Sequence, residues 1–163
     1  MKNKIVTLCL VLVSTFAMAG GDMVPSKSKS LDIPAKACKE NRVYVEKATK
    51  LMWQDQAYTD TDDGAFKNEK SRGKAGNHRY AEQYCSRLNY AGYADWRLPT
   101  SDELSHVHNE IEQVFNYFRD GDFWTSTPAV SHKFYTVYPA DAIQYARNQR
   151  QSNYIRCVRC MAE

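Results

Sequence analysis

The sequence has little net charge, few histidines and no long apolar run. Its 163 residues carry 22 lysines and arginines against 19 acidic residues, a formal charge of +3, and only 4 histidines. A nearly neutral chain lacks the concentrated basic face of nucleic-acid-binding proteins. The apolar run at 5–17 is shorter than the roughly 20 residues that a membrane-spanning helix needs. We therefore expect neither a nucleic-acid partner nor a membrane span in the mature chain.

The first 19 residues have the features of a cleaved secretory signal peptide. Two lysines open the segment, the apolar run follows, and the sequence Ala-Met-Ala at 17–19 supplies the small side chains of a cleavage site. Cleavage would remove two lysines and no acid, so the formal charge would fall from +3 to +1. An uncleaved anchor and a lipoprotein site at Cys9 are the alternatives.

A change of composition separates this segment from the rest of the chain. Residues 20–37 are rich in serine, lysine, proline and glycine and have little apolar periodicity, which favours a flexible tether. The stretch 38–163 is long enough for one domain with a hydrophobic core. We therefore expect a signal peptide at 1–19, a tether, and one domain that is periplasmic, secreted or held at the cell surface.

Four cysteines remain after cleavage. An even number in an exported chain implies disulfides, and four cysteines allow three pairings. Two of them form a CxxC motif, but residues i and i+3 of the strand predicted there point to opposite faces, which favours bonds to two different partners over a redox pair. The sequence has no second CxxC and no HxxxH, so we expect no zinc site. The four are Cys38, Cys85, Cys157 and Cys160.

Apolar side chains recur at helical spacing in two segments. The first helix is predicted at 77–89, with Asn77 as its N-cap. The second begins at a capping box formed by Thr100 and Glu103, and its apolar stripe runs to about Phe118.

Two groups of polar residues are candidate metal ligands. His106 and His108 lie two apart on the second helix and would point about 200° apart, so we expect surface histidines instead of a joint site. Residues 58–76 read as a polar surface loop. Its spacing excludes an EF-hand, because the ligand positions hold threonine and lysine, but leaves a looser calcium site open. The acids concerned are Asp60, Asp62 and Asp63.

Short runs of β-branched and aromatic residues predict strands, most of them after the helices. Two helices followed by several short strands indicate the α+β class. The C-terminal part is also locally basic, with Arg147, Arg150, Arg156 and Arg159, which favours a solvated strand face and leaves contact with acidic glycans open. The strands are predicted at 43–45, 51–53, 123–127, 134–138, 142–146 and 154–158.

The segment 92–104, GYADWRLPTSDEL, links the two helices. We expect Trp96 and Leu98 to alternate into the core and Pro99 to fix the turn before the second helix. The alternative makes Asp95, Trp96 and Arg97 a ligand site.

Four blocks in order carry a family resemblance. The chain reads ATKLMWQDQ, then AEQYCSRLNYAGY with DWRLPTSDEL, then FWTST, and finally YIRCVR. Between about Ala48 and Arg159 it resembles a bacterial family of unknown function, the C-terminal domain of the Lcl collagen-like adhesin. The resemblance implies a C-type-lectin-like fold, related in shape to formylglycine-generating enzymes. Two helices would then flank small antiparallel sheets, and the chain ends would lie side by side.

The resemblance also implies a disulfide pattern. Similar proteins place one cysteine on the first helix and one on the final strand, which corresponds here to Cys85 with Cys157. The extra pair, Cys38 and Cys160, would then close the two ends of the domain as a clasp.

The adhesin resemblance, the predicted export and the disulfides favour a non-catalytic binding module whose ligand is a glycan or an envelope protein. An accessory subunit of an envelope assembly and a relative of the formylglycine-generating enzymes are the alternatives. We predict no catalytic residue, cofactor or metal ligand, and the lectin tripeptides Glu-Pro-Asn, Gln-Pro-Asp and Trp-Asn-Asp do not occur. The candidate ligand contacts are Trp96, Arg97, Arg147, Arg150 and Arg156.

Overall fold

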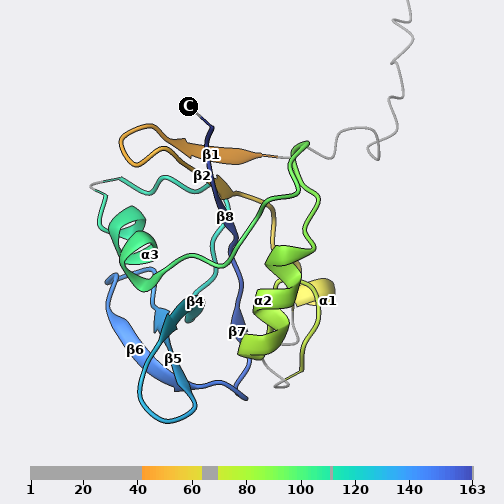
Figure 1. Ribbon diagram of the computed structural model, residues 1–163, viewed down its shortest axis with the longest axis vertical. Coiled ribbons are helices and arrows are strands. Elements are labelled where there is room, and N and C mark those ends of the chain that lie inside the picture. The colour runs from red at the N-terminus through yellow and green to blue at the C-terminus, as the bar shows by residue number, and fades with distance from the viewer. Residues whose placement is uncertain (1–41, 64–69, 111, 163) are drawn as a thin grey trace, which may run out of the picture. The chain divides into compact units, whose positions relative to one another are not determined.

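The computed structural model describes residues 42–63, 70–110 and 112–162 (Figure 1). The predicted signal peptide, the predicted tether and Cys38 lie outside these residues. No helix within the described part is both long and apolar enough to cross a membrane.

Helices and strands are mixed along the described chain, and the α+β class is confirmed. The helices are α1 (Asp60–Asp63), α2 (His78–Ser86) and α3 (Ser101–His108). The strands are β1 (Val43–Glu46), β2 (Leu51–Gln54), β3 (Ala75–Gly76), β4 (Phe123–Pro128), β5 (Lys133–Val137), β6 (Gln144–Asn148), β7 (Asn153–Tyr154) and β8 (Val158–Cys160).

The strands form two small sheets. The first has the order β1-β2-β8 and is antiparallel, so the first and last described strands flank the same partner (Figure 1). The second has the order β3-β7-β4-β5-β6 and is mixed, because β4 and β7 run parallel. The start and the end of the described domain therefore meet in one sheet.

The last predicted strand, 154–158, is wrong as a single element. The chain leaves the second sheet after β7 and joins the first sheet at β8. Between them, the Ile155 amide donates to the Lys74 carbonyl and the Cys157 carbonyl accepts from the Gln54 amide, each at 2.9 Å. The backbone changes partners within these residues, so one strand becomes a crossover between sheets.

The first predicted helix is confirmed as α2, whereas the second is wrong beyond His108. The Asn77 side chain caps α2, and α3 begins with the predicted capping box. Farther on, the amides of Asn116 and Tyr117 donate to the Asp55 carboxylate at 3.0 Å, so they have a buried carboxylate as acceptor in place of a helical carbonyl. Phe115 still enters the core, whereas Phe118, at the end of the predicted stripe, is exposed, so beyond His108 the stripe marks neither a helix nor a uniformly buried segment.

The predicted surface loop at 58–76 is also wrong in part. It contains α1 and β3, and Asp63 is buried with its carboxylate 3.3 Å from the ammonium group of Lys74. The same carboxylate accepts from the backbone amides of Thr59 and Lys74, and Asp60 pairs with Arg119. Because Asp63 is turned inward and fully engaged, it is not placed to bind calcium with its acidic neighbours.

The hydrophobic core has two clusters. The first joins Leu104 of α3 to Trp53 of β2 and Phe123 of β4. The second joins Cys85 of α2 to Trp124 of β4 and also contains Trp96, Leu98 and Cys157. Each long helix therefore covers its own part of the strands.

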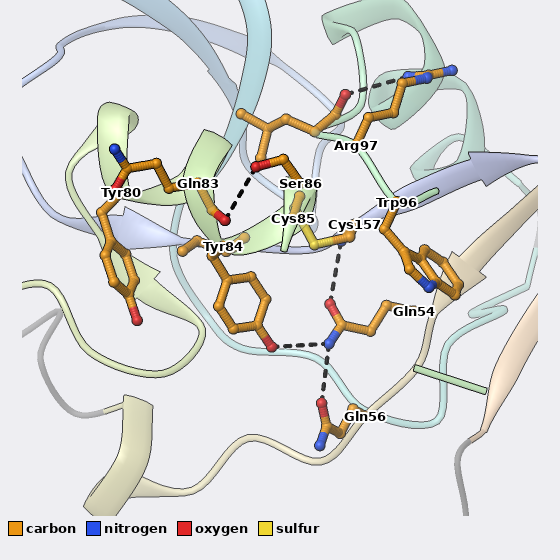
Figure 2. The surroundings of a disulfide bond; sticks show 12 residues. Gln54, Gln56, Tyr80, Gln83, Tyr84, Cys85, Ser86, Trp96, Arg97 and Cys157 are labelled. Carbon is orange, nitrogen blue, oxygen red and sulfur yellow. Dashed lines mark hydrogen bonds between the residues drawn. A yellow bond between two sulfur atoms is a disulfide. The ribbon is translucent and has the colours of Figure 1, made fainter. Parts of the chain in front are cut away.

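Cys85 and Cys157 form a disulfide, the pair that the family resemblance implied. Figure 2 shows the bond between α2 and the crossover, beside the Gln54 side chain. The Gln54 carbonyl oxygen accepts from the Cys157 amide at 3.3 Å, while its amide nitrogen donates to the Tyr84 hydroxyl at 3.1 Å. The disulfide and this amide thus hold α2 against the crossover together.

Arg156 lies in the crossover and is wholly buried. Its guanidinium donates to the carbonyls of Gln54 and Tyr117, lies 3.7 Å from the Asp55 carboxylate and stacks 3.6 Å from the centre of the Phe115 ring. The expectation of a solvated arginine face is therefore wrong for Arg156.

Breaking the buried pair of Asp55 and Arg156 should destabilise the protein strongly. Asp55→Ala or Arg156→Ala leaves one buried charge uncompensated, so we expect each to lower the free energy of unfolding by roughly 3–5 kcal/mol. The double alanine variant should lose less than the sum, because neither charge remains. Denaturant unfolding measures all three. Asp60→Ala, which breaks an exposed pair, serves as the control and should cost about 1 kcal/mol or less. An additive double variant would contradict the coupling.

Removing the disulfide should also destabilise the protein. The bridge joins residues 72 apart, so Cys85→Ala with Cys157→Ala releases a long loop in the unfolded chain, and we expect a loss of roughly 2–4 kcal/mol. Denaturant unfolding gives the value, and peptide mapping without reductant identifies the linked pair. Equal stability of the variant and the oxidised wild type would contradict this account.

Candidate binding surface

The segment around Trp96 is a packed hinge between the two long helices. Trp96 and Leu98 are buried, as predicted, and the indole N–H lies within hydrogen-bond distance of the carbonyls of Tyr90 and Tyr93 at 3.2 and 3.1 Å. The backbone of Arg97 pairs with Val158 of β8. Trp96 is therefore a core residue and offers no exposed face to a ligand.

The charges next to Trp96 are paired with each other. Arg97 donates to both carboxylate oxygens of Glu103, at 2.8 and 2.6 Å, and Glu103 also accepts from the Thr100 amide. Burial acts to raise the pKa of Glu103, but the hydrogen bonds from Arg97 and Thr100 together with the charge of Arg97 bring the pKa below its ordinary value. Arg97 is thus committed to the start of α3.

Asp95 and Arg159 form a second closed pair. Arg159 donates to both oxygens of Asp95 at 2.7 and 2.9 Å, and its guanidinium lies 3.9 Å from the centre of the Tyr93 ring. These hydrogen bonds lower the pKa of the Asp95 carboxyl. Arg159 is buried, so the solvated face expected for it is also wrong.

Arg147 and Arg150 differ in how far they are free to meet a ligand. Arg147, on β6, lies 2.5 Å from the Asp122 carboxylate and over the Tyr145 ring. Arg150, in the turn after β6, is exposed, and its guanidinium has no hydrogen-bond or ion-pair partner among the described residues. Of the five predicted ligand contacts, Arg150 is the one whose charge is both exposed and uncommitted.

Arg150 borders a hollow of about 390 Å³ at the start of α2. The turn after β6 is fixed to this helix, because the His78 amide donates to the Gln149 carbonyl at 3.0 Å. The hollow, which we call the α2 hollow, is lined by Asn77, His78, Arg79, Glu82, Phe134, Gln149 and Arg150.

His78 forms the rigid floor of the α2 hollow. Its ring stacks on Phe134 with 3.4 Å between centroids, and Nε2 lies 2.9 Å from the Thr125 carbonyl. Burial lowers the pKa of His78, although the Thr125 carbonyl and the nearby carboxylate of Glu82 act in the opposite direction. The imidazole is therefore neutral at pH 7, and it contributes to the shape of the α2 hollow but not to its charge.

The charge of the α2 hollow comes from two arginines and one acid. Arg79 is exposed and, like Arg150, has no partner for its guanidinium among the described residues. Glu82 is half exposed and lies 3.8 Å from His78 Nδ1. With the imidazole neutral, the lining carries an excess of one positive charge and two guanidinium groups free to bind an anion.

Sequence reasoning missed Arg79 and His78 as parts of this surface. Arg79 stands beside apolar residues in a helix and reads as an ordinary solvated side chain. Contacts between distant segments, among them the hydrogen bond between His78 and Gln149, bring the start of α2 to the turn that holds Arg150.

The histidines of α3 divide between surface and interior. His106 is exposed, as predicted, but His108 packs on the rings of Phe115 and Phe123. Burial first, and then the charge of Arg156, lowers the pKa of His108 to about 4. The expectation of a surface residue is wrong for His108.

Cys160 is exposed and has no disulfide bond to a described residue. Its predicted partner, Cys38, lies outside the described residues, so the clasp between the two stays a prediction.

The buried His78 should make stability depend on pH. The folded protein binds a proton at His78 more weakly than the unfolded chain does, so the free energy of unfolding should fall as the pH drops through about 6.5 and below. His78→Gln should reduce this slope between pH 7 and 5 in urea unfolding, while His108 contributes equally to both proteins. His132→Asn, at an exposed turn, is the control. A slope unchanged by His78→Gln would contradict the assignment.

Comparison with known proteins agrees with the fold-wide resemblance seen in the sequence. No curated protein matches the chain. The family model of the Lcl C-terminal domain matches residues 42–159, which begin just before β1 and end within β8. The match covers both sheets, both long helices and the α2 hollow, and the chain belongs to the Lcl C-terminal domain family.

Proposed function

We propose that the mature chain is an exported, non-catalytic binding module that holds an anionic glycan in the α2 hollow. The observation that carries the proposal is the meeting of Arg79 and Arg150, two exposed guanidinium groups without carboxylate partners among the described residues, at one hollow. Guanidinium groups bind carboxylate and sulfate oxygens through paired hydrogen bonds, and exposed ones keep this capacity in solution.

The proposal includes a C-type-lectin-like fold and a site of action in the periplasm or at the cell surface. Support for the fold comes from the flanking of β2 by the first and last described strands and from the bridge between α2 and the crossover. A structural disulfide fits an oxidising compartment. The sequence resemblance to the C-terminal domain of a collagen-like adhesin is a further reason to propose a binding role.

A catalytic role of the formylglycine-generating type is less well supported. That chemistry needs a free pair of cysteines, and Cys157 is already bonded to Cys85. Cys160, the other cysteine of the CxxC motif, supplies only one thiol and cannot form such a pair by itself.

Glycan binding tests the proposal directly. The mature chain should bind immobilised heparin, a sulfated glycan, and bind a neutral glycan far more weakly, with affinity falling as salt screens the exposed charges. Arg79→Gln with Arg150→Gln should weaken heparin binding about tenfold or more, since charge-assisted hydrogen bonds contribute roughly 1.5–3 kcal/mol each.

Arg72→Gln with Arg87→Gln is the matched control, because it removes two exposed arginines outside the α2 hollow. Equal losses of heparin affinity in both double variants would show that net charge alone determines binding. That result would overturn the proposed site. If the chain binds no glycan but co-purifies with an envelope protein, that result would support the accessory-subunit alternative instead.

A further inference from the structure

One buried carboxylate lies apart from the α2 hollow and has an unsatisfied oxygen. Glu46, the last residue of β1, is only 4% exposed, and its Oε2 accepts from the Trp53 indole N–H at 3.0 Å. Its Oε1 is buried with no hydrogen-bond partner among the described residues. Buried polar atoms are rarely left without a hydrogen bond. The neighbouring imidazole of His106 forms an ion pair with this oxygen only when it is protonated, so with a neutral imidazole both atoms can bind a cation.

The space beside this oxygen is lined by two further donors. His106 Nε2 lies 3.1 Å from Glu46 Oε1 and 3.9 Å from Glu110 Oε1. His106 lies in the last turn of α3, and Glu110 follows four residues later, just beyond the helix. All three ligand atoms lie within 4.8 Å of one another.

We propose that Glu46, His106 and Glu110 form a binding site for a zinc-class divalent cation. Zinc ligands at about 2.0–2.2 Å in a tetrahedron stand roughly 3.3 Å apart. Glu46 and His106 already have nearly that spacing. Glu110 is 43% exposed, so a change of its side-chain rotamer closes the remaining gap without moving the backbone.

The chemistry of the donors selects the metal. Calcium and magnesium prefer six or more oxygen ligands, whereas an imidazole nitrogen with two carboxylates suits zinc. Three protein ligands leave the fourth position for water, and the cation offsets the two carboxylate charges. The site would join β1 of the first sheet to the end of α3. Sequence reasoning had excluded His106 and His108 as a pair, and the structure gives His106 different partners.

Calorimetric titration of the untagged, metal-free mature chain with zinc chloride tests the site. We expect one zinc ion per chain, no comparable heat with calcium chloride, and a higher melting temperature in zinc. His106→Gln and Glu110→Gln should each weaken zinc binding tenfold or more, because even changes around metal ligands cost about 10–100-fold. Both side chains are exposed enough for these variants to fold.

Matched controls are His132→Asn and Glu112→Gln, which remove an exposed imidazole and an exposed carboxylate outside the cluster and should leave the affinity unchanged. Glu46→Gln keeps an acceptor for the Trp53 indole and should also weaken binding. Absence of zinc binding would overturn the proposal. So would zinc binding that survives His106→Gln and Glu110→Gln, or that disappears only when the Cys160 thiol is alkylated.

Discussion

The buried ion pair between Arg156 and Asp55 is the constraint on which the rest of the described domain depends. A guanidinium removed from water stays charged only where carbonyl oxygens and a carboxylate surround it. Here the acceptors come from the end of β2 and from the chain after α3, and the arginine itself lies between the two sheets. Satisfying one charge therefore fixes three segments that are far apart in sequence, and the ring of Phe115 packs on the guanidinium.

This arrangement also decides which basic groups remain at the surface. Arg156 belongs to the core, Arg97 to the start of α3, and Arg159 to the loop that contains Asp95. These three arginines thus hold the fold together. Two exposed arginines without partners among the described residues, Arg79 and Arg150, lie where α2 meets the turn after β6. The structural role of arginine and the binding role that we propose for it therefore belong to different parts of the chain.

Local signals in the sequence predicted the elements that depend on local physics. The cap at Asn77, the capping box at Thr100 and the alternation of Trp96 with Leu98 act over a few residues, and each was read correctly. The end of α3 and the break after Tyr154 were not predictable in this way, because a carboxylate and carbonyls from distant segments determine them. The proposed site follows the same division. The sequence predicted Arg150 as a ligand contact, but tertiary contacts between distant segments place it near Arg79.

The order of the first sheet has a mechanical consequence. Val43 lies opposite Gln54, whereas Cys160 lies opposite Leu51, so the chain enters β1 at one end of β2 and leaves β8 at the other. Antiparallel hydrogen bonds run perpendicular to the strands. A pull between residues 42 and 162 along the strand direction would load these bonds together in shear instead of opening them one after another. The smaller, three-stranded sheet would therefore resist tension applied between the two ends of the described domain.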